Sequence, residues 1–91
     1  MTIAFDPGKD AINRDKHGLS LADASRGDWA AAFIALDDRR DYGEFRWYAY
    51  LPIEGRVHVA VYTEREDVTW MISLRRANPR EVRKYDALRI R

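Results

Sequence analysis

The chain contains no cysteine among its 91 residues. Disulfide bonds, thiolate metal sites and cysteine nucleophiles are therefore excluded. No apolar run approaches the roughly 20 residues that a membrane-spanning helix needs, and residues 1–7 lack the basic and apolar regions of an export signal. The sequence also has no Gly-rich phosphate loop and no G-x-S-x-G element. These absences predict a cytoplasmic protein without membrane contact, and they argue against nucleotide-dependent and serine-hydrolase functions.

The length and composition suit one folded domain, with 46% hydrophobic and 34% charged residues. We find no repeat, linker or low-complexity segment, so we predict a single domain over 1–91. The net charge of +1 hides an uneven distribution, because residues 1–45 carry six Lys and Arg against nine Asp and Glu, and residues 46–91 carry ten against six. Most of the basic residues are Arg, which grips phosphate and stacks on bases. The basic half is either a polyanion-binding surface or a solvated one.

Helix-end signals predict three helices. Asp6-Pro7 is typical of an N-cap followed by proline at the first helical position, and Gly18 suits a left-handed C-cap. Ser20, with an aspartate three residues later, resembles a capping box. Asn78-Pro79, with a glutamate three residues after the cap, starts a C-terminal helix in which Val82, Tyr85 and Leu88 share one stripe. The two N-terminal helices are short, at about 7–16 and 21–27.

From residue 45 onward the pattern changes to period two, which is typical of strands. Residues 29–36 are ambiguous, because alanine favours helix whereas the Phe33 to Leu36 end suits a buried strand. We predict a strand over 33–38 there. The other strands are predicted at 45–51, 57–63 and 68–74, consecutive and antiparallel. The fold class is therefore α+β, with an antiparallel sheet of three to four strands between the N-terminal helices and the C-terminal helix.

Turn length and apolar pattern together predict which side chains share a face of the sheet. A three-residue loop, 53–55, puts Gly55 in the left-handed position and brings Leu51 opposite Val57. A two- or four-residue turn around Arg65-Glu66 then aligns the third strand. The predicted core face carries Trp47, Ala49, Leu51, Val57, Val59, Val61, Trp70, Ile72 and Leu74. The predicted opposite face carries Arg46, Tyr48, Tyr50, His58, Tyr62, Thr69, Ser73 and Arg75.

That opposite face is aromatic, hydroxylated and cationic, as single-stranded RNA requires, although a solvated face with ordinary cross-strand packing has the same composition. RNA is cleaved without a metal when its 2′-hydroxyl attacks the adjacent phosphate, and Arg, Lys, His and Tyr supply the proton transfers and charges needed. His17 and His58 are the imidazoles available. His17 also has a plain explanation as a helix-end cation, and His58 as a solvent-facing strand residue. The acidic residues lie in turns without metal-ligand spacing, so no metal or cofactor is expected.

Several stretches together resemble the BrnT toxins, which pair with BrnA antitoxins. No single stretch is specific, but their order and spacing extend from Phe5 to Tyr85. The matching parts are Phe5-Asp6-Pro7 with Lys9 and Asn13, Lys16-His17-Gly18-Leu19-Ser20-Leu21, Gly43-Glu44-Phe45-Arg46, Val61-Tyr62-Thr63-Glu64-Arg65, Ile72-Ser73-Leu74-Arg75-Arg76-Ala77, Glu81 and Tyr85.

The resemblance implies a RelE-like fold, a metal-independent endoribonuclease, and a BrnA-like antitoxin that neutralises it. It also implies that operator DNA is bound only through the antitoxin. By position, and with the sheet-face argument, the catalytic candidates are Arg46, Arg75, His17 and Tyr85. The RNA-binding candidates are Lys9, Lys16, Tyr48, Tyr50, His58 and Arg76.

The chain departs from the family where Arg-x-Arg usually precedes the Ile-Ile-Ser stretch, because it has Val68-Thr69-Trp70 there. Two expected cations are therefore absent. On the predicted register Trp70 points into the core, and a register shifted by one residue would instead place it on the active face. Two alternatives stay open: a catalytically silent homologue that partners an antitoxin in operator repression, and an RNA-binding domain that does not cleave.

Overall fold

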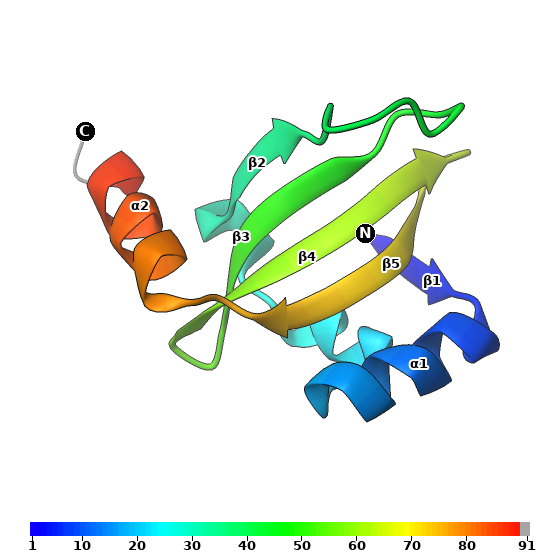
Figure 1. Ribbon diagram of the computed structural model, residues 1–91, viewed down its shortest axis with the longest axis horizontal. Coiled ribbons are helices and arrows are strands. Elements are labelled where there is room, and N and C mark those ends of the chain that lie inside the picture. Colours follow the sequence, from blue (N-terminus) through cyan, green and yellow to red (C-terminus); the bar gives the residue numbers. More distant parts are fainter. Residues whose placement is uncertain (90–91) are drawn as a thin grey trace.

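A five-stranded mixed sheet organises the chain (Figure 1). The computed structural model describes residues 1–89. The strand order across the sheet is β1-β5-β4-β3-β2, with β1 parallel to β5 and every other pair antiparallel. The elements are β1 (Thr2–Phe5), α1 (Pro7–His17), the 3₁₀ helices η1 (Leu21–Arg26) and η2 (Trp29–Ala31), β2 (Phe33–Leu36), β3 (Trp47–Ile53), β4 (Arg56–Arg65), β5 (Val68–Arg76) and α2 (Pro79–Arg89).

The predicted α+β class is confirmed, but the predicted sheet of three to four antiparallel strands is wrong. The additional strand, β1, precedes the first helix and pairs in parallel with residues 68–71 of β5. Its four residues are too few for a clear alternation in the sequence. It forms because a distant strand, more than 60 residues along the chain, offers a free edge.

The predicted helix ends are confirmed. The Asp6 side chain accepts a hydrogen bond from the backbone N–H of Lys9 at 3.0 Å, and Gly18 ends α1 with φ 71°. Ser20 forms the expected capping box, although the helix that follows is 3₁₀ rather than α. At the start of α2, Asn78 accepts from the Glu81 N–H at 2.8 Å, while the Glu81 carboxylate accepts from the Asn78 N–H at 2.9 Å.

The predicted β3–β4 register is wrong by one residue. Ile53 pairs with Arg56, so the turn contains two residues, Glu54 and Gly55, and both have positive φ. Such a turn matches the twist of the flanking strands better than the three-residue loop predicted from the sequence. Leu51 consequently pairs with His58 instead of Val57. A shift of one residue moves every side chain of β4 to the other face.

One face of the sheet is covered by η1, η2 and the residues next to them, and we call it the covered face. Trp29 of η2 packs edge-on against Tyr62, with ring centroids 5.4 Å apart. The segment before η2 approaches so closely that a Cβ on Gly27 would lie 2.6 Å from the Leu51 side chain. The buried core on this face comprises Leu21, Ala24, Ala49, Leu51, Ile53, Ala60, Tyr62, Met71 and Leu74.

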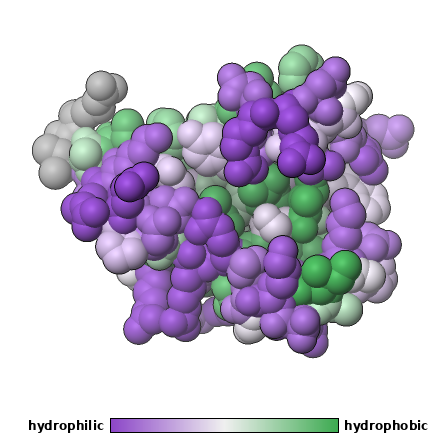
Figure 2. Space-filling view, in the orientation of Figure 1, coloured by the Kyte–Doolittle hydropathy of each residue, from purple (hydrophilic) through white to green (hydrophobic). Residues whose placement is uncertain are grey.

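The other face, which we call the open face, carries the β4 valines. The pairing of Tyr48 with Val61 and of Val59 with Arg75 puts aromatic, aliphatic and cationic side chains side by side. At one end α2 packs over this face, where Tyr85 contacts Tyr50 and Val59. Figure 2 shows this face hollowed at its centre, with hydrophobic side chains at the bottom and hydrophilic ones around the rim.

Several predicted face assignments are therefore wrong. His58, Tyr62 and Thr69 lie on the covered face and are buried. Trp70 lies on the open face, because it pairs with Thr63, whereas its neighbour Met71 is in the core. A bulge in β5 next to Val61 and Tyr62 changes the alternation within that strand. The predicted assignments that hold on the open face are those of Arg46, Tyr48, Tyr50, Ser73 and Arg75.

Asn13 of α1 completes the edge of β5 beyond the point where β1 ends. Its side-chain amide donates to the Leu74 carbonyl at 2.9 Å and accepts from the Leu74 N–H at 2.9 Å. It also donates to the Leu19 carbonyl at 2.8 Å. The side chain thus replaces a missing strand partner and holds α1 along the sheet edge, because buried backbone groups must be paired.

We expect Asn13→Ala to lower the free energy of unfolding by about 2 kcal/mol, because it leaves the Leu74 N–H and carbonyl buried without partners. Urea denaturation measures this loss. The neighbour Ile12 provides the control, since it is 62% exposed and Ile12→Ala removes mostly solvent-facing surface. A loss below about 0.5 kcal/mol for Asn13→Ala would be the size of an ordinary surface substitution and would contradict this role.

Candidate nucleic-acid interface

The hollow on the open face is a cavity of about 620 Å³. Val59 and Val61 of β4 form an apolar floor, and Tyr48 and Tyr50 stand beside them with ring centroids 5.6 Å apart. Polar and charged side chains surround this floor. The complete lining is Lys16, His17, Leu36, Asp37, Asp38, Arg39, Tyr48, Tyr50, Val59, Val61, Ser73, Arg75 and Glu81. An apolar floor with aromatic and cationic walls suits an unstacked base joined to a phosphate.

Lys16 and His17 reach this cavity from the last turn of α1. The helix runs beside the free edge of β5, where Asn13 is bonded to Leu74. Because this contact brings the helix against the sheet edge, the two basic residues at its end line the open face. Gly18 then turns the chain away, with its N–H bonded to the Arg14 carbonyl at 2.9 Å.

Arg75 meets Glu81 in a bidentate ion pair on the cavity wall. Both N–O distances are 2.8 Å, and the Arg75 side chain is 38% exposed. The Arg75 guanidinium lowers the pKa of the Glu81 carboxyl below its ordinary value, and burial opposes this shift only in part. The same carboxylate caps α2 through the Asn78 N–H. Glu81 therefore holds the start of α2 in place and also partly neutralises the positive charge of the cavity.

A second ion pair lies on the opposite wall, in the loop after β2. Arg39 donates to the two Asp37 oxygens at 2.8 and 2.9 Å, and these bonds are the main cause of the lowered pKa of the Asp37 carboxyl. Tyr42 also donates to this carboxylate, at 3.3 Å. Arg46 stacks on the Tyr42 ring, with its guanidinium carbon 4.0 Å from the centroid. Arg46 supports this loop and does not line the cavity.

The structure brings together five of the predicted site residues and separates the others. Those that line the cavity are Lys16, His17, Tyr48, Tyr50 and Arg75. Tyr85 is buried, and its hydroxyl donates to the Ala31 carbonyl at 2.7 Å, so it anchors α2 and its catalytic assignment is not supported. The predicted place of His58 is wrong, because it lies on the covered face with its Nδ1 2.8 Å from the Arg56 carbonyl. Arg46, Lys9 and Arg76 also lie outside the cavity lining.

Sequence reasoning missed four polar residues of the cavity wall: Asp37, Asp38, Arg39 and Glu81. In the sequence, Glu81 is fully explained as the capping residue of the C-terminal helix. Nothing in the sequence indicates its second contact, with Arg75. The polar character of residues 37–39 indicated only an exposed turn. Their place beside the cavity follows from the pairing of β2 with β3, which a short and ambiguous segment does not predict.

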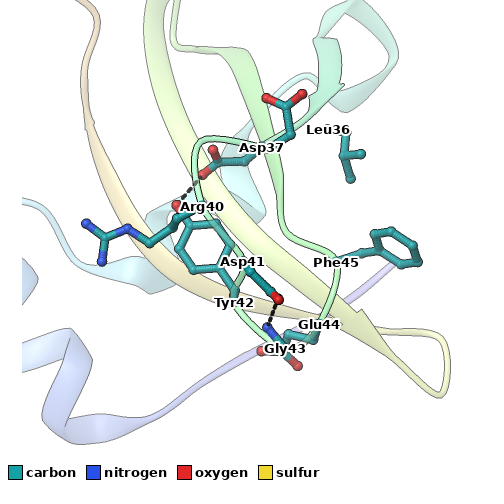
Figure 3. Close-up of a pocket in the computed structure, with 9 residues that line it drawn as sticks. Leu36, Asp37, Arg40, Asp41, Tyr42, Gly43, Glu44 and Phe45 are labelled. Atoms are coloured by element: carbon teal, nitrogen blue, oxygen red, sulfur yellow. Dashed lines mark hydrogen bonds between the residues drawn. The ribbon is translucent and has the colours of Figure 1, made fainter.

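A second cavity, of about 760 Å³, lies within the loop between β2 and β3. Figure 3 shows its lining, with the Tyr42 hydroxyl directed at Asp37 and the Asp41 carboxylate bonded to the Gly43 N–H. Leu36 and Phe45 supply apolar surface, and the charged residues are mostly acidic. Carboxylates repel phosphate, so the smaller cavity is the better candidate for a nucleic acid.

Comparison with known protein families matches residues 5–81 to the ribonuclease toxin BrnT of type II toxin–antitoxin systems. The chain belongs to this family. The BrnT assignment made from the sequence is thereby confirmed, and it brings with it a ribonuclease activity and an antitoxin partner as family properties. A search of curated proteins found no match. None of the helices within residues 1–89 has the length and apolar character needed to cross a membrane.

The Arg75–Glu81 ion pair should make the folding stability of this BrnT member depend on pH. Because the pKa of Glu81 in the folded chain lies below its ordinary value of 4.5, the pair stabilises the fold above that value, and the contribution fades as pH falls through and below it. We expect Glu81→Gln to be less stable than the wild type near pH 7, with a smaller difference at pH 3.5.

Urea denaturation at the two pH values measures this difference. Glutamine retains the capping bond to Asn78, so the substitution tests the charge and not the cap. An equal difference at both pH values would show that the ion pair contributes nothing to folding.

Proposed function

We propose that this BrnT chain cleaves RNA by metal-independent acid and base catalysis in the cavity of the open face. One observation supports the proposal most: Lys16, His17 and Arg75 line the same cavity as Tyr48 and Tyr50, although they come from separate elements. The arginine and lysine supply charge for a phosphate, the imidazole supplies proton transfer, and the tyrosines supply base contacts.

The proposed reaction uses the 2′-hydroxyl of the RNA as the nucleophile. Its oxygen bonds to the adjacent phosphorus while the bond from phosphorus to the 5′-oxygen breaks, giving a 2′,3′-cyclic phosphate and a 5′-hydroxyl. One group takes the 2′-hydroxyl proton and another delivers a proton to the leaving oxygen. His17 is our candidate for one of these transfers. Arg75, with Lys16 beside His17, stabilises the additional negative charge on the phosphate oxygens in the transition state.

The partner proposed from the family is a BrnA-like antitoxin that binds tightly and blocks this cavity. In this proposal the toxin acts on RNA in the cytoplasm, and operator DNA is bound only by the antitoxin within the complex. The cavity is accessible to a protein partner, because it opens on a sheet face that α2 covers at one end (Figure 1).

Cleavage by the purified protein tests the enzyme proposal. We expect RNA to be cut in the presence of a chelator, and Arg75→Ala to slow the cut by about 100-fold or more, since it removes a charge from the transition state. His17→Asn is expected to slow it at least as much and to change the pH dependence of the rate. The products identify the mechanism by their 2′,3′-cyclic phosphate ends.

Arg56→Ala is the matched control, because this exposed arginine begins β4 at the turn and lies outside the cavity lining. It should cleave at the wild-type rate. Loss of activity in the control as well as in Arg75→Ala would show a general charge effect, and intact RNA with the wild-type protein would show that this member does not cleave.

A silent antitoxin partner is the second candidate function, and two observations favour it. Arg75 is already held by Glu81, and Val68 and Trp70 occupy positions where the resemblance to the family implies arginines. The double variant Arg46→Ala with Arg75→Ala separates the candidates. If the double variant no longer arrests growth but still binds the antitoxin, catalysis is supported. Wild-type expression that is harmless, with antitoxin binding intact, supports the silent partner.

A further inference from the structure

Trp70 lies on the open face in the same cross-strand row as Thr63. One position beyond the paired part of β3, the register places Arg46 in that row as well, and the Thr63 hydroxyl donates to the neighbouring Phe45 carbonyl at 2.8 Å. The next rows along the open face contain Tyr48 with Ser73, and then Tyr50 with Arg75. The cavity and Trp70 are thus successive parts of one surface.

The Trp70 ring is half-buried and has a cation beside it. The Arg65 guanidinium carbon lies 5.9 Å from its ring centroid, and the Arg65 side chain is 57% exposed. Glu44 accepts from Nε and Nη2 of Arg65, and within residues 1–89 the other terminal nitrogen, Nη1, donates no hydrogen bond. An indole face next to an available guanidinium donor suits a base and its phosphate.

Trp70 is separated from Arg75 by a distance that only an oligonucleotide spans. Their partners on β4, Thr63 and Val59, are four residues apart, which corresponds to about 13 Å along a strand. One nucleotide cannot touch both places. We propose that Trp70, flanked by Arg65, is a second base-binding subsite that holds single-stranded RNA beyond the nucleotides at the cavity. This inference rests on the proposed function, because it assumes that RNA binds at Arg75.

The same surface limits how far the RNA extends. Beyond Trp70 the β4–β5 turn consists of two exposed acidic residues, Glu66 and Asp67, both with positive φ. Their carboxylates repel a further phosphate. In this proposal the bound RNA therefore extends from Arg75 to the base on Trp70 and no further.

Oligonucleotides of two lengths test the subsite. Cleavage is measured on a diuridine phosphate and on hexauridylate. Binding is measured by the fluorescence anisotropy of dye-labelled hexauridylate carrying 2′-O-methyl groups, which has no nucleophile. The variants are Trp70→Ala and Trp70→Phe. Val68→Ala is the matched control, because Val68 is an apolar neighbour on the same strand and face. Urea denaturation shows that each variant is folded.

We expect Trp70→Ala to weaken binding of the methylated hexamer about tenfold, the usual size of one base-stacking contact. Its cleavage of the dinucleotide should be unchanged, because that substrate is too short to reach the indole. Trp70→Phe should retain most of the affinity, and Val68→Ala all of it. If Trp70→Ala does not fold, the partial loss in Trp70→Phe decides the matter.

Three results would overturn the subsite. These are hexamer binding that is unchanged in Trp70→Ala, an equal loss for dinucleotide and hexamer, and a loss of antitoxin binding without any loss of hexamer binding. The last result would assign Trp70 to the partner protein. Failure of the proposed function gives a different pattern, because the wild type would then leave both substrates uncut while the binding assay still measures the contribution of Trp70.

Discussion

The two-residue turn between β3 and β4 is the constraint on which the remaining structure depends. With Glu54 and Gly55 both at positive φ, Ile53 pairs with Arg56, and this register sets the face of every β4 side chain. Ala60 and Tyr62 then point toward the N-terminal half of the chain and complete the core. Val59 and Val61 point the other way, and there they form the floor of the cavity. A loop longer by one residue would exchange these sets and bury the floor.

The N-terminal segment depends on this arrangement and contributes to the cavity in turn. Because β1 covers only residues 68–71, the rest of the β5 edge is open to α1. Asn13 occupies that edge through the Leu74 backbone, and α1 therefore ends beside the open face. The side chains at its end, Lys16 and His17, become part of the cavity wall. A short first strand is thus the reason why a helix can contribute cations to a site on the sheet.

The sequence predicts the local features of this fold well and the long-range ones less well. Helix ends at Asp6, Gly18 and Asn78 depend on neighbouring residues, and they agree with the structure. The strand β1 and the hairpin register depend on contacts between distant segments. In β4 the valines alternate with His58, Ala60 and Tyr62, so both faces of the strand carry apolar side chains and hydrophobicity alone does not select between them. For this reason the predicted face failed for His58.

In the proposed function, the charges of the cavity favour a long RNA substrate over a short one. Arg39 is held by Asp37 and Arg75 by Glu81, so each arginine has already lost part of its attraction for phosphate. The pairs also fix the two guanidinium groups in place, and an oriented arginine retains N–H donors for a phosphate oxygen. These arginines therefore orient a single phosphate well but bind it weakly. Additional affinity has to come from contacts along the strand, and the apolar floor, the tyrosines and Trp70 lie along that path.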